Sequence, residues 1–157
     1  MTSATVDTRI DIDASAEAVW AVLTDFDAYP QWNPFWVRVT GTLRVGGRLR
    51  VRVRPPLGVP LRFRPQIVHC DEPRELWLRG ELGWRWLAHG EHRFEIVPCD
   101  HGVRLMHSET FGGILPRLLR RVLTVQTHRG FEAMNQALAS RVGRASNAAL
   151  GGVRLMS

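Results

Sequence analysis

Two neighbouring runs carry the strongest structural signal in this sequence: residues 90–97, Gly-Glu-His-Arg-Phe-Glu-Ile-Val, and residues 102–112, Gly-Val-Arg-Leu-Met-His-Ser-Glu-Thr-Phe-Gly. In both runs apolar and polar side chains alternate, which is typical of a strand with one buried face. Turn residues lie between the runs, and a helical pattern follows from Gly113. We therefore predict an antiparallel hairpin that leads directly into a long helix.

Polar side chains share the inward-facing positions of this hairpin. The apolar parity carries His92, Phe94, Ile96, Val103, Leu105, His107, Glu109 and Phe111. Counting outward from the turn places Glu109 opposite His92, with the Cβ atoms of such a pair about 5 Å apart. By the same parity, Leu78 of the preceding strand lies near His92. Polar groups on a face meant for the core predict a sheet that lines a cavity.

The composition is that of a single globular domain. The chain has 157 residues, 45% of them apolar, its net charge is +6, and all 21 basic residues are arginine. No apolar run approaches the ~20 residues of a membrane span. The first residues lack the basic start and apolar stretch of a secretory signal. We therefore expect a cytoplasmic protein in which Cys70 and Cys99 are free thiols.

Arginines alternate with apolar residues along two further strand candidates. They are Arg48, Arg50, Arg52, Arg54, Arg62 and Arg64, and the spacing places them on the solvent side of neighbouring strands. Such a face could attract phosphates or an acidic partner. The sequence lacks the interleaved exposed aromatic residues of a single-strand binder and any helix-turn-helix or zinc pattern. We therefore expect no nucleic-acid binding.

The remaining elements follow in an α+β order. Residues 5–13 alternate as a first strand, Ser15 caps a helix, and a second short helix ends at Trp32. Six further strands are predicted at residues 36–42, 48–54, 61–70, 75–82, 87–97 and 103–111. The last helix closes a single domain over residues 1–142, and residues 143–157 are interpreted as a flexible tail.

The last helix has one apolar stripe. Stepping about 100° per residue groups Leu115, Leu119, Val122, Leu123, Gly130, Ala133, Met134 and Ala137 on one side. Asn135 falls on the opposite side, and Gln126 is the one polar side chain near the centre of the stripe. Gly130 either allows close packing or leaves room for a ligand.

Four segments resemble a known family. They are residues 14–26 (Ala-Ser-Ala-Glu-Ala-Val-Trp-Ala-Val-Leu-Thr-Asp-Phe), 29–35 (Tyr-Pro-Gln-Trp-Asn-Pro-Phe), 90–95 (Gly-Glu-His-Arg-Phe-Glu) and 130–138 (Gly-Phe-Glu-Ala-Met-Asn-Gln-Ala-Leu). With the order of the elements, they make residues 4–142 similar to the SRPBCC superfamily, which has the helix-grip fold of START domains and birch-pollen-allergen-like proteins. The local sequence is most similar to its bacterial polyketide-cyclase-like branch.

The resemblance implies a fold and a tunnel. A curved antiparallel sheet of about seven strands would grip the last helix, with two short helices after the first strand and a hydrophobic tunnel between sheet and helix. The resemblance implies no shared catalytic set.

The candidate site residues gather in this tunnel. Catalytic candidates are His92, Glu109 and His107, because a buried His–Glu pair can act as a base or orient a carbonyl or phenol. A neighbouring donor, His107 or Gln126, could hold an enolate. Candidate ligand-binding residues are Trp32, Phe35, Leu78, His92, Phe94, His107, Glu109, Phe111, Gln126 and Gly130. The His–Glu pair could equally do no more than satisfy two polar groups near the cavity mouth.

Metal and cofactor chemistry has little support in the sequence. On a strand, His89-Gly90-Glu91-His92 turns its two histidines to opposite sides, unlike a helical zinc signature. The sequence also has no glycine-rich phosphate loop. We expect no metal and no cofactor. Trp84 and Trp86, in a hairpin loop, are expected to cover the pocket rim or form a dimer contact.

Three functions remain open. The first is the binding of a small hydrophobic molecule, aromatic, polyketide-like or lipid, in the tunnel. The second is an aromatase/cyclase-type enzyme that uses the pocket His/Glu pair. The third is a protein-binding adaptor of the chaperone-activator type that uses the arginine-rich face. A monomer and a homodimer both fit the sequence.

Overall fold

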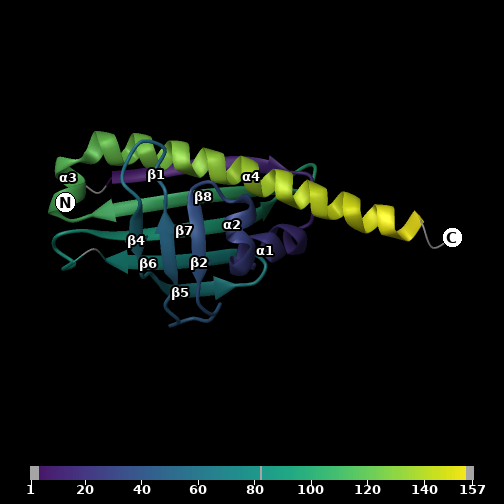
Figure 1. Cartoon of the computed structure of the whole chain (residues 1–157), viewed down its shortest axis with the longest axis horizontal. Helices are drawn as coiled ribbons and strands as arrows, with labels where there is room; N and C mark the ends of the chain where they lie inside the picture. Colours follow the sequence, from purple (N-terminus) through teal and green to yellow (C-terminus); the bar gives the residue numbers. More distant parts are fainter. Residues whose placement is uncertain (1–3, 82, 155–157) are drawn as a thin grey trace.

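Two antiparallel sheets and a long helix make up the fold. The computed structural model of the chain describes residues 4–81 and 83–154, with side chains up to residue 146. The larger sheet has the strand order β1-β8-β7-β6-β5 and the smaller has the order β2-β3-β4. The strands of the smaller sheet run across those of the larger one, and the last helix lies along β1 (Figure 1). The predicted α+β helix-grip fold is confirmed.

The described strands number eight rather than about seven. Their bounds are β1 Ala4–Ile12, β2 Trp36–Thr40, β3 Arg50–Val53, β4 Leu61–Phe63, β5 Gln66–Asp71, β6 Glu75–Glu81, β7 His89–Pro98 and β8 Val103–Gly112. The strand predicted at 61–70 is therefore two strands, one in each sheet. Pro65 lies between them, and a proline has no amide hydrogen with which to continue a ladder. Residue 82, the predicted end of β6, lies outside the described residues.

The register of the central hairpin is the predicted one. Glu109 pairs with His92, His107 with Phe94, and Leu105 with Ile96. On the other side of β7, Leu78 pairs with His92. A short turn between two alternating runs leaves only one register that buries both apolar faces, because a slip by one residue turns every side chain over.

Three short helical segments follow β1. Helix α1 spans Ala16–Thr24, and Ser15 caps it as predicted, with its Oγ accepting a hydrogen bond from the Ala18 amide at 3.2 Å. The 3-10 turn η1, Phe26–Ala28, and helix α2, Tyr29–Trp32, follow. Asn33 then turns the chain into β2, because its Oδ1 accepts hydrogen bonds from the amides of Phe35 and Trp36.

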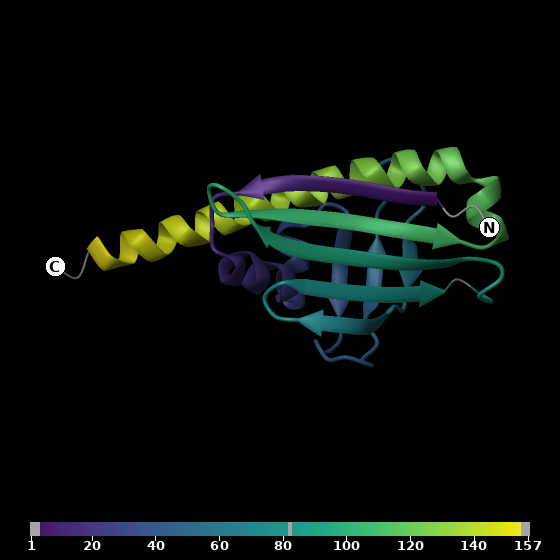
Figure 2. The ribbon, with the colours of Figure 1, turned by 180° about the vertical axis from the view of Figure 1, so that it is seen from behind.

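The C-terminal helix differs from the prediction at both ends. It consists of α3, Ile114–Leu118, and α4, Arg120–Arg154. Helix α3 is separated from α4 at Leu119, whose backbone (φ −100°, ψ 16°) departs from α-helical geometry. The first amides of α3 bond to the carbonyl oxygens of Trp86 and Leu87. Helix α4 continues through the segment predicted as a tail from residue 143. Its last turns extend past the end of the sheet (Figure 2).

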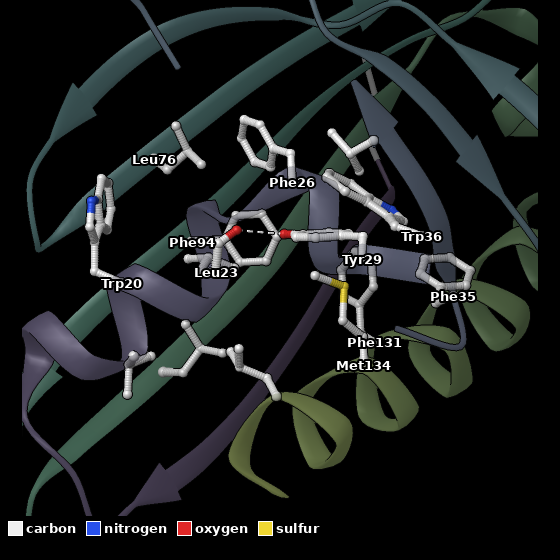
Figure 3. Packing of buried hydrophobic residues seen from close by; sticks show 14 of the residues in the cluster. Trp20, Leu23, Phe26, Tyr29, Phe35, Trp36, Leu76, Phe94, Phe131 and Met134 are labelled. Carbon is white, nitrogen blue, oxygen red and sulfur yellow. Dashed lines mark hydrogen bonds between the residues drawn. The ribbon is translucent and has the colours of Figure 1, made fainter. Parts of the chain in front are cut away.

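The core lies between the larger sheet, α1, α2 and α4. Figure 3 shows aromatic rings from α2, β2, β7 and α4 that meet there, among them Tyr29, Trp36, Phe94 and Phe131. The Tyr29 hydroxyl donates a hydrogen bond to the Leu23 carbonyl at 2.7 Å, which satisfies the polar end of a fully buried ring. This packing fixes the position of α4 against the sheet.

The buried face of α4 differs from the predicted stripe. Phe131, Met134, Leu138 and Val142 are buried, and so is the polar Asn135. Three residues of the predicted stripe, Leu119, Val122 and Ala133, are exposed instead. The centre of the contact is set by β1 and α1, which the periodicity of the helix alone does not report.

Candidate functional site

A cavity of about 340 Å³ lies between the two sheets and the start of the C-terminal helix. Its apolar lining comes from the smaller sheet (Val51, Val53, Leu61, Phe63), from the larger sheet (Leu78, Phe111) and from the helices (Leu115, Leu119, Leu123). The volume falls within the range of about 300–1,000 Å³ that is usual for small-molecule pockets. Six predicted ligand-binding residues line the cavity: Phe35, Leu78, His92, Glu109, Phe111 and Gln126.

Glu109 is one of two acidic residues in this lining, the other being the exposed Glu81. The side chain of Glu109 is 21% exposed, and its Oε2 lies 3.3 Å from Nδ1 of His92, whose side chain is only 6% exposed. Gly90 of β7, which pairs with Phe111 of β8, makes room for the carboxyl. A Cβ at Gly90 would lie 2.8 Å from Oε1 of Glu109. The predicted His–Glu pair is therefore present and reaches the cavity.

A chain of hydrogen bonds continues from this pair into the core. Nε2 of His92 lies 2.8 Å from Nε2 of His107, and Nδ1 of His107 lies 2.8 Å from Oδ1 of Asn135. The Asn135 amide donates to Oγ1 of Thr8 at 3.0 Å. Both imidazole rings are packed among aromatic rings, and His107 stacks on Phe131 with ring centroids 3.7 Å apart.

Burial favours the neutral form of each titratable group in this row of hydrogen bonds. It raises the pKa of Glu109 from 4.5 to about 8 and lowers the pKa of His92 from 6.5 to about 3. Burial also lowers the pKa of His107 well below its ordinary value, and the neighbouring His92 adds to this effect. At neutral pH, Glu109 is therefore a carboxylic acid beside a neutral imidazole.

Four predicted ligand-binding residues do not line the cavity. Trp32 and Phe94 belong to the core, and His107 lies behind His92. Gly130 packs against the ring of Phe35, where a Cβ would come 2.3 Å from Cε2. Of the two roles predicted for Gly130, the structure shows close packing. Trp32 and Phe94 shape the site only through the walls behind it.

Gln126 lines the cavity in a different role from the predicted donor. Its Oε1 accepts a hydrogen bond from the Leu57 amide at 2.8 Å and so joins α4 to the β3–β4 loop. Sequence reasoning missed Thr8, Asn135 and Thr127. Thr8 shares the inward parity of Val6 and Ile10, which is the one signal that could have pointed to it.

Large exposed apolar residues lie on loops and helices that also supply lining residues of the cavity. They are Leu57 and Val59 of the β3–β4 loop, Trp84 and Trp86 of the β6–β7 loop, and Leu118 and Val122 of the helices. The rings of Trp84 and Trp86 stack 5.8 Å apart, and the Trp86 carbonyl accepts the Ile114 amide.

The arginine-rich face lies on the outer side of the smaller sheet. Arg52 pairs with Arg38 on one side and Arg62 on the other, and all three are exposed. Residues 28–70 contain no acidic residue. Among residues 4–81 and 83–154, no group of three or more histidine, cysteine or acidic side chains is arranged to hold a metal ion.

A sheet wrapped around a long helix with an apolar cavity between them defines a helix-grip protein. Residues 3–143 match the model of the polyketide cyclase/dehydrase and lipid transport family. The chain therefore belongs to this family, as the resemblance predicted. Among curated proteins, no sequence matches the chain.

Solved structures share this fold. The Zhui aromatase/cyclase from Streptomyces sp. R1128 is 19% identical with a TM-score of 0.74, and the match covers 94% of this chain and 98% of that one. A START superfamily protein from Mycobacterium smegmatis is 24% identical with a TM-score of 0.71, covering 90% and 99%. A norcoclaurine synthase point mutant from Thalictrum is 16% identical with a TM-score of 0.71, covering 92% and 97%. At these identities the likeness concerns the fold.

The helices were also compared with the requirements of a membrane span. Within the described part of the chain, no helix is both long enough and apolar enough to cross a bilayer.

Proposed function

We propose that this protein binds a small, largely apolar molecule in the cavity between the sheets and the C-terminal helix. The observation that carries the proposal is the cavity itself, about 340 Å³ with an almost wholly apolar lining that includes the Glu109–His92 pair. An apolar cavity with a few placed polar groups is the usual form of a small-molecule site. Aromatic, polyketide-like and lipid ligands are the classes that fit.

Native mass spectrometry of the purified protein, followed by denaturing extraction, tests this function. We expect a stoichiometric small molecule or, for an empty protein, thermal stabilisation by flat hydrophobic compounds. Gly80→Val should abolish either signal, because Gly80 lines the cavity and its Cβ would meet only ordinary contacts at 3.7 Å. Thr110→Val, on the exposed face of β8, is the control. A protein with no adduct and no stabilisation by any compound contradicts the proposal.

A second candidate function, favoured by Glu109, is an aromatase/cyclase-type reaction in the same cavity. A bound substrate could give an acidic proton to Oε1 of Glu109 while the hydrogen on Oε2 passes to Nδ1 of His92. Glu109→Gln separates the two functions. Loss of turnover with retained ligand binding supports the enzyme, whereas a protein without turnover on any aromatic polyketide substrate supports the binding module alone.

A further inference from the structure

In the row of hydrogen bonds behind the cavity, each atom has one fixed role as donor or acceptor, and the Thr8 hydroxyl determines these roles. The Thr8 hydroxyl donates its single hydrogen to the carbonyl oxygen of His107 at 3.1 Å. Toward Asn135 its oxygen can therefore only accept. Asn135 must present its Nδ2 to Thr8, at 3.0 Å, and its Oδ1 to His107, at 2.8 Å. One backbone carbonyl thus determines the orientation of a buried amide.

The orientation of Asn135 in turn determines which ring nitrogens of His107 and His92 carry a hydrogen. Because Asn135 Oδ1 only accepts, Nδ1 of His107 carries a hydrogen. His107 is fully buried and no carboxylate contacts it, so its imidazole is neutral and Nε2 is an acceptor. Nε2 of His92, 2.8 Å away, must then carry the hydrogen of the contact between the rings. Nδ1 of His92 is left to face Glu109.

One hydrogen lies between Nδ1 of His92 and Oε2 of Glu109, whether the pair is neutral or ionised. In a neutral pair the carboxylic acid donates to the imidazole, and in an ion pair the imidazolium donates to the carboxylate. In both cases Oε1 of Glu109 carries no hydrogen. Oε1 is the oxygen beside Gly90, and no donor among the described residues contacts it. Glu109 therefore presents a hydrogen-bond acceptor to the cavity.

We propose that the ligand carries a hydroxyl group, as a phenol, enol or alcohol, and donates its hydrogen to Oε1 of Glu109. This inference rests on the proposed binding function and adds the chemical class of the ligand. A ketone of the same shape would bring a second lone pair against Oε1 and leave both acceptors without a hydrogen, which is costly at a carboxyl whose side chain is only 21% exposed. The donor and acceptor roles that Thr8 determines would thus select hydroxyl compounds over carbonyl compounds.

Matched alcohol and ketone pairs test the selection. The probes are 9-fluorenol with 9-fluorenone and 1-tetralol with 1-tetralone, titrated by calorimetry. We expect each alcohol to bind at least about tenfold more tightly than its ketone. The Glu109→Gln variant should still bind the alcohol more tightly than the ketone, because a glutamine amide donates to His92 and presents its carbonyl oxygen to the ligand. Glu109→Met should remove the preference.

The outcomes of these titrations separate the two proposals. If the alcohol and the ketone of a pair bind equally, or if the ketone binds more tightly, the proposal that the ligand donates a hydroxyl hydrogen to Glu109 is overturned. The proposed binding function itself would still stand. If no probe binds and no small molecule is extracted from the protein, the proposed function fails, and the donor and acceptor roles are decided by spectroscopy.

Nitrogen NMR of histidine-labelled protein reads these roles without a ligand. We expect His107 to carry its hydrogen on Nδ1 and His92 to carry one on Nε2, with signals assigned by removing the four other histidines one at a time. A hydrogen on Nε2 of His107, or its absence from Nε2 of His92, overturns the proposal. Thr8→Val should allow the opposite tautomers, whereas Thr5→Val, which removes an exposed hydroxyl from the same strand, should not.

Discussion

Gly80 of β6 and Gly90 of β7 lie directly opposite each other, and both line the cavity. The space around them differs. A Cβ at Gly80 would meet nothing closer than 3.7 Å, whereas a Cβ at Gly90 would come 2.8 Å from Oε1 of Glu109. The two positions therefore separate the volume of the cavity from the placement of its carboxyl.

This difference predicts opposite results for the two alanine variants. Gly90→Ala should displace the Glu109 carboxyl and weaken the binding of hydroxyl ligands at least about tenfold, which corresponds to about 1.4 kcal/mol. Gly80→Ala removes only a little volume from the cavity and should weaken the binding of alcohols and ketones by the same factor. Titration of both variants with the same alcohol and ketone checks this. A uniform loss for both ligands in Gly90→Ala would show that the carboxyl does not discriminate between them.

The stability of the protein should fall between pH 6.5 and pH 8. Folded Glu109 keeps its proton up to about pH 8, whereas an unfolded glutamic acid loses it near 4.5. The folded state therefore binds more protons in this window, and stability decreases as pH rises. The lowered pKa values of His92 and His107 act in the opposite sense, because an unfolded histidine keeps part of its proton up to about pH 7.5. They offset only part of the fall.

Glu109→Gln isolates this effect in denaturant unfolding measured across the pH range. The wild-type protein should lose on the order of 1 kcal/mol relative to the variant between pH 6.5 and 8. The exposed histidines of the chain are common to both proteins and cancel in the difference. Parallel pH curves for the two proteins would mean that Glu109 is already ionised at neutral pH.

Gly130→Ala should destabilise the protein although it adds helix propensity. The new Cβ would come 2.3 Å from the ring of Phe35, so the ring or the helix must shift. Overpacking of this kind costs about 1–3 kcal/mol. Gly143→Ala is the matched control on the same helix, because nothing lies within 4 Å of its Cβ position. There the change should stabilise by about 0.5–1 kcal/mol. Thermal unfolding of the two variants would contradict this account if both were stabilised.

Arg52→Glu should stabilise the smaller sheet. Arg52 faces Arg38 and Arg62 across the neighbouring strands, and like charges directly opposite one another are destabilising. We expect a gain of about 0.5 kcal/mol that shrinks as salt is added. Arg144→Glu, the same charge change on an exposed position of α4, should give no such gain. Should Arg52→Glu have no salt-dependent effect, the row of arginines would not be a source of strain.

Local patterns were sufficient for much of the fold. The register of β7 and β8 follows from two alternating runs and a short turn, and the start of α1 follows from Ser15 and its first helical turn. The pairing of His92 with Glu109 was predictable for the same reason. Each of these features depends on residues close in sequence, whose contacts are dictated by backbone geometry.

The rest of the site was decided by tertiary packing. Asn135 fell outside the apolar stripe predicted for the last helix, yet it is buried because α4 lies along β1 and meets Thr8, 127 residues earlier in the sequence. The packing of Gly130 against Phe35 likewise depends on a neighbouring element. The sequence by itself determined most of the strands, the register of β7 and β8, and the residues of the His–Glu pair. Only the tertiary structure decided which atoms face the cavity and in which direction its hydrogen bonds run, because those contacts join segments whose distance in sequence leaves no local periodicity.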